Sequence, residues 1–200
     1  MEMQSEKDEF NIDTYMASLM TTSFGRVLLW SPRLPSTQDV VSLNFSEIPI
    51  GSVCIADLQF KGRGRSQNIW ESPKGSLLFS FTMQMEDGRV VPLVQYVVCL
   101  AMTEAFRILL SKMVSHLLIS KKFNIRVGLN VNNEKPTTSL NAALKKLNSD
   151  YQLQREEITS AFFNQFEHLF HILINQGFQP LEELYYKTWL HSGQRLLFRV

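Results

Sequence analysis

The sequence predicts one α+β domain, in which a mixed or antiparallel sheet is flanked by helices. Short strand-like apolar runs dominate the first half of the 200 residues, and longer helical patterns dominate the second half. Strands and helices do not alternate regularly, so a parallel α/β fold is not expected. The length suits a single sizeable domain.

The first elements are a strand and a capped helix. Residues 27–30 (VLLW) form a short apolar run typical of a buried strand. Pro32 and Pro35 interrupt the chain after it. Ser36 then precedes the apolar residues of 40–43, which predicts a helix that begins with Ser36 as its N-cap.

Two further strands are expected at 52–58 (SVCIADL) and 76–83 (SLLFSFTM). The intervening residues 59–75 contain glycines and have no apolar periodicity, so we expect a long loop. Loops of this length inside compact domains are usually functional or mobile.

The remaining chain predicts a long apolar helix over 90–110, a strand over 123–131 and a short helix over 140–147. A last long helix follows, because apolar residues recur at helical spacings: Ile158, Ala161, Phe162, Phe166, Leu169, Phe170 and Leu173. We expect this stripe to be core, with Gly177 ending the helix and Pro180 in the first turn of another.

Composition excludes several functional classes. The net charge of +1 gives no strong non-specific attraction to nucleic acid or to an anionic membrane. The two cysteines are too few for a disulfide framework. No apolar run is expected to approach the length of a membrane span. The first residues, MEMQSEKDEF (1–10), resemble no targeting segment, which favours a cytoplasmic location, with an organellar form of the same gene as an alternative. Residues 1–25 have no sustained periodicity and predict a mobile extension.

The segment most suited to chemistry is residues 61–75 (KGRGRSQNIWESPKG). Its glycines allow backbone N–H groups to approach a ligand, and Arg63 and Arg65 supply donors for phosphate or carboxylate. Trp70 offers a flat face for a ring. The alternative is a solvated basic turn that touches RNA, against which the near-zero net charge argues.

A longer pattern surrounds this loop and resembles biotin–protein ligases. Its sequence most resembles those of plant holocarboxylase synthetases. The similar stretches are LPSTQDV (34–40), IADLQFKGRGRSQNIWESPKGSLLFSF (55–81), RVGLNVNNEKPTTSLNA (126–142) and YYKTWLHSGQR (185–195). The similarity covers roughly residues 26–110 and 121–196. These motifs separate the family from lipoate ligases, which carry a different arginine-rich signature; a lipoyl or octanoyl transferase is therefore disfavoured.

The resemblance implies the biotin/lipoate ligase catalytic fold over residues 26–200. It also implies a reaction in which biotin and ATP, with Mg²⁺, give biotinyl-5′-AMP, and the biotinyl group passes to a lysine of a biotin carrier domain of a carboxylase. The resemblance leaves the oligomeric state and the acceptor carboxylase open. No protein metal site is expected, because the histidines have no carboxylate or cysteine at ligand spacing.

The family motifs also imply roles for individual residues. Those matching biotin contacts are Ser36, Thr37, Gln59, Gly62 and Arg63. Those matching nucleotide contacts are Arg65, Trp70 and Asn130. Arg63 and Arg65 match the catalytic positions, where they neutralise charge as the biotin carboxylate attacks the α-phosphate.

Each assignment has a structural alternative. Ser36 could only cap its helix, and Gln59 could lie on a surface loop. Trp70 could be ordinary core, and Asn130 could be a turn residue. For the four histidines, structural or surface roles are favoured over metal binding.

The chain also departs from the family. The K-W-P-N-D and K-x-G-G-I-L segments are absent, which predicts an internal deletion near residues 111–120, whether from splicing or from the gene model. The family's small C-terminal β-domain has no counterpart before Val200. The second interpretation is therefore a catalytically impaired variant that acts only as a weak biotin-binding or carrier-binding module.

Overall fold

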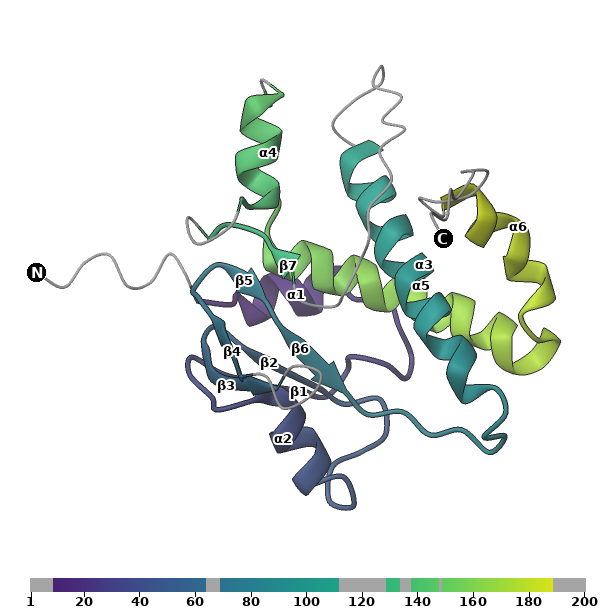
Figure 1. Cartoon of the computed structure of the whole chain (residues 1–200). Helices are drawn as coiled ribbons and strands as arrows, with labels where there is room; N and C mark the ends of the chain where they lie inside the picture. The colour runs from purple at the N-terminus through teal and green to yellow at the C-terminus, as the bar shows by residue number, and fades with distance from the viewer. Residues whose placement is uncertain (1–8, 64–68, 112–128, 134–137, 148, 189–200) are drawn as a thin grey trace, which may run out of the picture.

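The computed structural model describes residues 9–63, 69–111, 129–133, 138–147 and 149–188. Of residues 63, 69–71 and 129 it describes the backbone alone. Within these residues, helices cover both faces of a small mixed sheet (Figure 1). The predicted α+β class is confirmed.

The central sheet has the strand order β1-β2-β6. Strand β1 (Leu28–Ser31) runs parallel to β2 (Val53–Ala56), and β6 (Phe79–Phe81) runs antiparallel to β2. All four residues of β2 are buried, because both of its edges are paired and both faces are covered. Ile55 lies opposite Phe79 in this ladder.

Two short antiparallel pairs extend the structure beyond the central sheet. Strand β3 (Gln59–Arg63) pairs with β4 (Ile69–Ser72), and β5 (Ser76–Leu77) pairs with β7 (Leu129–Asn130). The predicted loop over 59–75 is therefore wrong in part, since a hairpin occupies most of it. Its sequence lacks apolar alternation, so periodicity alone did not reveal the strands.

The two other strand predictions are partly met. The strand expected over 76–83 is divided into β5 and β6, which pair with different partners. Of the strand expected over 123–131, only β7 lies within the described residues.

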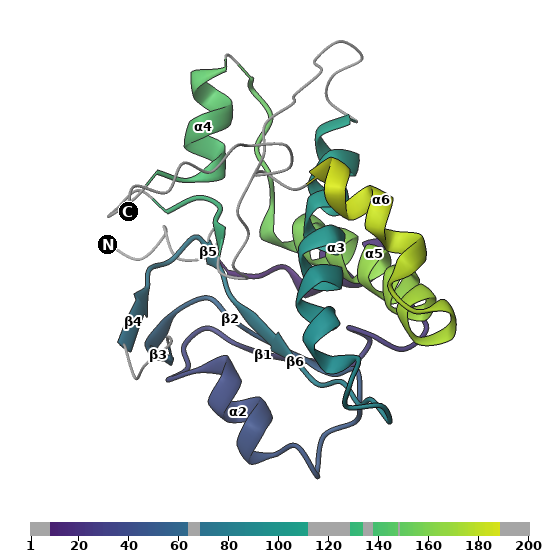
Figure 2. The same ribbon diagram turned by 45° about the vertical axis from the view of Figure 1, so that its right-hand side comes forward.

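Helix α2 (Thr37–Leu43) lies on one face of the central sheet, and α3 (Val91–Ser111) and α5 (Arg155–Gln176) pack against each other on the opposite side (Figures 1 and 2). The predicted aromatic stripe of α5 is core. Its Phe166 ring meets that of Phe81 edge-on at 5.0 Å between ring centroids. Such offset and edge-on arrangements are favoured between aromatic rings.

By length and composition, α3 could cross a membrane, contrary to the expectation that no apolar run approaches that length. A core helix has the same properties, and α3 buries residues such as Val97, Leu100 and Ala105 in the common core. The two remaining predicted helices are α4 (Leu140–Lys146) and α6 (Gln179–Thr188).

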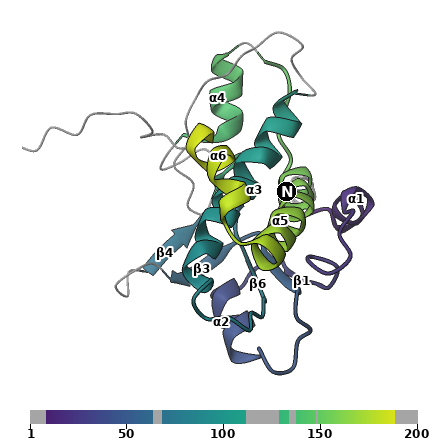
Figure 3. The ribbon, with the colours of Figure 1, turned by 90° about the vertical axis from the view of Figure 1, so that its right-hand side faces the viewer.

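The N-terminal segment differs most from its prediction. Residues 9–25 belong to the folded domain, and α1 (Ile12–Ser18) lies along α5 on the side away from α3 (Figure 3). Tyr15 is fully buried, and its hydroxyl donates a hydrogen bond to the Gly25 carbonyl at 2.8 Å. The expected mobile extension over 1–25 is therefore corrected for residues 9–25.

Side chains of α5 hold this segment through its backbone. The Glu167 carboxylate accepts from the backbone N–H groups of Thr22, Ser23 and Phe24 at 2.7–2.9 Å, and from the Thr22 hydroxyl at 3.0 Å. Asn164 accepts from the Met20 N–H at 2.8 Å. These contacts use main-chain atoms that every sequence has, so no local pattern predicts them.

Candidate functional site

Ser36 and Thr37 stand at the start of α2. The Ser36 hydroxyl accepts from the Asp39 N–H at 3.3 Å, which confirms the predicted N-cap. Both side chains are buried, at 1% and 3% exposure. Capping and ligand contact are compatible for a serine at this position, so the biotin contact stays a prediction.

Gln59 begins β3 and faces Thr37. Its side-chain oxygen accepts from the Thr37 N–H at 2.7 Å and from the Thr37 hydroxyl at 3.2 Å. The same hydroxyl lies 3.0 Å from that of Ser80 in β6. Gln59 is 6% exposed, so the surface-loop alternative is wrong. The structure thus brings three residues that are predicted to contact biotin to one place, where α2, β3 and β6 meet.

The hairpin that begins at Gln59 carries the Gly–Arg motif. Gly62 lies opposite Trp70 and Arg63 opposite Ile69, with an irregularity in the ladder between residues 59 and 62. Arg65 lies outside the described residues, as do the side chains of Arg63 and Trp70. The described backbone thus places the start of the Gly–Arg motif on the strand that supplies Gln59.

The residues after the hairpin contact the predicted nucleotide motif. Ser76 pairs with Asn130 in the β5–β7 ladder, and the Gly75 carbonyl accepts from the Asn132 N–H at 3.0 Å. Gly75 has φ +84°, and a Cβ there would lie 2.8 Å from the backbone of Asn132 and Asn133. The S-P-K-G and N-V-N-N motifs are therefore neighbours in space, although more than fifty residues separate them in sequence.

A polar pocket of about 680 Å³ adjoins this second motif, between the end of β7 and α4. Its lining includes Asn132, Asn133, Ser139, Lys145 and Tyr151. Asn133 is 4% exposed, and among the residues that the structure describes neither polar atom of its side chain has a hydrogen-bond partner. Buried amides are normally satisfied, so this side chain suits a polar ligand group.

Asp57 is a buried acidic residue to which the sequence motifs assigned no role. Its carboxylate forms an ion pair with Arg155 at 2.7 Å and accepts from the Trp30 indole N–H at 3.2 Å and the Phe10 N–H at 3.1 Å. Burial raises the pKa of Asp57, and these partners oppose the rise. The available sequence signal was an acidic side chain that directly follows a wholly apolar strand.

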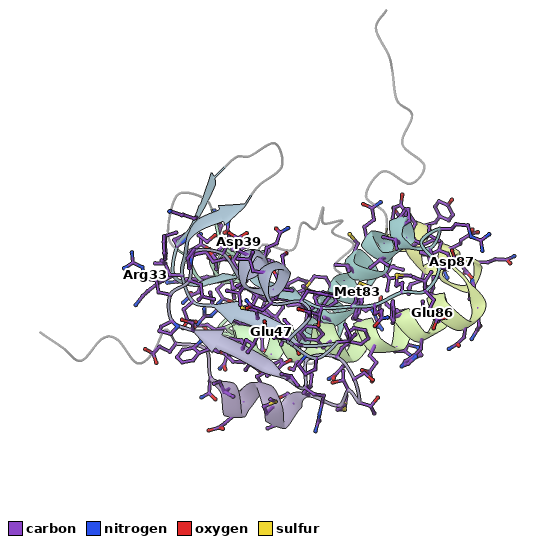
Figure 4. All side chains as sticks on the ribbon, turned by 90° about the horizontal axis from the view of Figure 1, so that it is seen from below. Arg33, Asp39, Glu47, Met83, Glu86 and Asp87 are labelled. Atoms are coloured by element: carbon purple, nitrogen blue, oxygen red, sulfur yellow. The ribbon has the colours of Figure 1, made fainter. Side chains whose placement is uncertain are left out.

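Other charges lie at two ends of the molecule. Figure 4 places Arg33 and Asp39 toward the β3–β4 end, whereas Glu86 and Asp87 lie at the opposite end. The Arg33 guanidinium sits 4.9 Å from the centre of the Phe60 ring on β3. Within the described residues, no cluster of three or more His, Cys, Asp or Glu side chains is arranged to hold a metal ion.

Comparisons with solved structures define the class of the fold. A biotin protein ligase from Leishmania major in complex with biotinyl-5-AMP superposes with a TM-score of 0.66 at 16% identity, over 88% of this chain and 85% of that one. The Aquifex aeolicus biotin protein ligase in complex with biotin and ATP gives 0.63 at 20% identity, over 83% and 79%. At such identities the likeness establishes the catalytic-domain fold.

Sequence comparison then establishes the family. Residues 30–135 match the biotin/lipoate A/B protein ligase family. The chain is 51% identical to the chloroplastic biotin–protein ligase 1 of Arabidopsis thaliana, over 98% of this chain and 61% of that protein. It is 50% identical to Arabidopsis biotin–protein ligase 2, over 98% and 68%. The chain therefore belongs to the biotin/lipoate A/B protein ligase family, and the resemblance seen in its motifs is confirmed.

The alignments with both Arabidopsis proteins contain more positions than this chain supplies. Each Arabidopsis alignment runs over 224 positions, whereas 98% of this 200-residue chain is about 196 residues. The difference leaves about 28 positions that the relatives fill and this chain does not. The predicted deletion point, near residues 111–120, lies mostly outside the described residues, so its location stays a prediction.

Proposed function

We propose that this chain acts as a biotin–protein ligase. A biotin carboxylate oxygen attacks the α-phosphorus of ATP, the bond between the α- and β-phosphates breaks, and pyrophosphate leaves. A lysine amine of a carrier domain then attacks the biotinyl carbonyl, loses a proton and displaces AMP. The products are an amide-linked biotin and AMP.

One observation carries this proposal: Gln59 is locked to Thr37 at the base of the hairpin that bears Gly62 and Arg63. Buried polar groups at this point can orient the polar end of a ligand. Arg63 on the same strand, and Arg65 two positions later in the sequence, carry positive charge suited to the negative charge of the acyl phosphate.

We further propose that the nucleotide binds beside the second motif, where Asn130 and Asn133 lie next to Gly75. Asn133 offers an amide that has no partner within the described part of the chain, and a base or ribose can hydrogen-bond to such a group. Mg²⁺ would accompany the phosphates of ATP, as is usual for this ion.

The direct test incubates purified chain with biotin, ATP labelled at the α-phosphate, and a carboxylase carrier domain. We expect biotinyl-5′-AMP and a biotinylated carrier. The double variant Arg63→Ala/Arg65→Ala should lose about a hundredfold in adenylation rate and bind biotin more weakly. Arg89→Ala is the matched control, because Arg89 pairs with Asp87 at the far end of the molecule. Unchanged biotin affinity in the double variant would refute the assigned roles.

The internal deletion favours a second candidate, a variant that binds biotin or carrier without completing the reaction. About 28 aligned positions are missing in total. The family resemblance implies that the lysine of the absent K-x-G-G-I-L segment lies near the reacting groups. Adenylate without transfer would indicate a half-reaction. Biotin-induced thermal stabilisation without adenylate would indicate a binding module, and stabilisation by lipoate instead would indicate a different substrate.

The relatives include a protein named chloroplastic and one whose name carries no such label. We propose a cytoplasmic location for this chain, with an organellar form of the same gene as the alternative. A fluorescent fusion of the full chain expressed in plant cells would test this proposal. Signal confined to plastids would contradict it.

A further inference from the structure

A buried polar junction lies at the end of β2, away from the predicted ligand contacts. Asp57, which is 2% exposed, contacts Phe10 from the N-terminal segment, Trp30 from β1 and Arg155 from the start of α5. Each partner comes from a different segment of the chain. A buried carboxylate is costly unless it is paired and hydrogen-bonded, so the three contacts hold these segments in one arrangement.

Asp57 also lies between the end of β2 and the start of the β3–β4 hairpin. At Asp57 and Leu58 the chain leaves the central sheet, and at Gln59 it enters the β3–β4 hairpin. The Asp57 N–H bonds to the Ser31 carbonyl at 3.3 Å, and the Leu58 carbonyl accepts from the Leu34 N–H at 3.0 Å. Asp57 therefore sits at the point that sets the direction of the hairpin.

We propose that Asp57 is a positioning residue for the ligand site, and that the N-terminal segment is part of this device through the Phe10 amide. The carboxylate fixes the junction between β2 and β3, which holds Gln59 against Thr37 and aims the Gly–Arg hairpin at the site. This inference rests on the proposed function for its ligand, biotin. Asp57 would act by holding other residues in place and not by contacting the ligand, because its side chain faces α5 and the N-terminal segment.

The variants must separate positioning from simple loss of stability. Asp57→Asn keeps the shape and an acceptor but removes the negative charge that faces Arg155. Asp57→Asn/Arg155→Gln removes both charges of the pair, so that neither variant result rests on a single buried charge. Asp87→Asn makes the same chemical change at an exposed site. Leu173→Ala, in the buried far half of α5, supplies a destabilised control with an intact junction.

The first readout needs no ligand. Hydrogen–deuterium exchange should show faster exchange at the Thr37 amide and in residues 59–63 of both Asp57 variants, while residues 79–81 stay protected. The Leu173→Ala and Asp87→Asn proteins should keep the protection of Thr37. Equal protection of Thr37 in folded Asp57 variants and in the unmodified chain would overturn the proposal.

The second readout is ligand binding, measured by calorimetry with biotin and separately with ATP. The Asp57 variants should bind biotin about tenfold or more weakly, since small misplacements of contacts have large effects. ATP affinity should change little. Unchanged biotin affinity in folded variants would overturn the positioning role. If the unmodified chain bound no biotin, the proposed function would fail, and the exchange experiment would still decide whether Asp57 fixes the junction.

Discussion

Thr37 donates twice to one side-chain oxygen of Gln59, through its N–H at 2.7 Å and its hydroxyl at 3.2 Å. The backbone donor belongs to the first turn of α2, where such groups lack partners inside the helix. Gln59 therefore caps the helix from another strand, in addition to the cap that Ser36 provides. The start of α2 and the start of the hairpin are coupled as a result.

Replacing Thr37 with valine tests this coupling. The change keeps the branched shape but removes the hydroxyl, which also lies 3.0 Å from that of Ser80. We expect a loss of about 1 kcal/mol in the free energy of unfolding, because the hydrogen bonds of the hydroxyl with Gln59 and Ser80 are lost. Urea denaturation measures this loss, and biotin titration should show weaker binding. Val41→Ala, on the same helix, controls for destabilisation of α2.

Glu167 makes the docking of the N-terminal segment dependent on pH. Burial alone would raise the pKa of Glu167, but the hydrogen bonds from residues 22–24 outweigh it, and the pKa lies below the ordinary value. A depressed pKa means that the stabilisation is complete above the ordinary glutamate pKa of about 4.3 and disappears as the pH falls through the folded-state pKa.

Glu167→Gln should therefore lower the unfolding free energy at pH 7 by about 2 kcal/mol, the scale of hydrogen bonds to a charged group. The difference from the unmodified protein should shrink as the pH falls below 4. Urea denaturation at both pH values measures the two differences. A constant difference across this range would show that ionisation of Glu167 is irrelevant to the docking.

Local patterns predicted the elements that owe their form to local chemistry. The Ser36 cap and the apolar face of α5 are visible in the sequence, and both are present in the structure. Ser36, Thr37 and Gln59 come from two separate motifs and are buried near one another, and the motifs alone did not give the hydrogen bond between Thr37 and Gln59.

Contacts distant in sequence account for what was missed. Helix α1 has seven residues, too few for stability alone, and the segment that follows it is held by Glu167 and Asn164, about 145 positions away. The Asp57–Arg155 pair joins residues 98 positions apart, and no spacing rule connects them. The hairpin over 59–72 is polar and pairs outside the main sheet, so apolar alternation does not mark it.

Cys54 should be inert in the native protein. It lies in the fully buried strand β2, and burial raises the pKa of its thiol to about 11. The reactive thiolate is therefore scarce at neutral pH. Iodoacetamide at pH 7.5 should leave Cys54 unmodified in the folded chain and alkylate it in guanidinium chloride, as intact-mass and peptide mass spectrometry would show. Rapid native alkylation would contradict the buried position of β2.

Gly75 and Gly177 allow backbone strain to be separated from steric exclusion. Both have positive φ, at +84° and +79°. A Cβ at Gly177 would meet nothing within 4 Å, whereas one at Gly75 would lie 2.8 Å from the backbone of Asn132 and Asn133. Gly177→Ala should cost about 2 kcal/mol from backbone strain alone, because φ +79° with ψ −170° is a conformation that essentially only glycine adopts.

Gly75→Ala should cost about 3 kcal/mol, because strain and overpacking add and a backbone cannot swing aside as a side chain can. Thermal and urea unfolding of the two variants would give the difference directly. The clash also pushes the S-P-K-G motif away from the N-V-N-N motif, so ATP affinity should fall in Gly75→Ala and stay unchanged in Gly177→Ala. Equal effects of the two substitutions on stability would mean that the two motifs are not packed together as the structure places them.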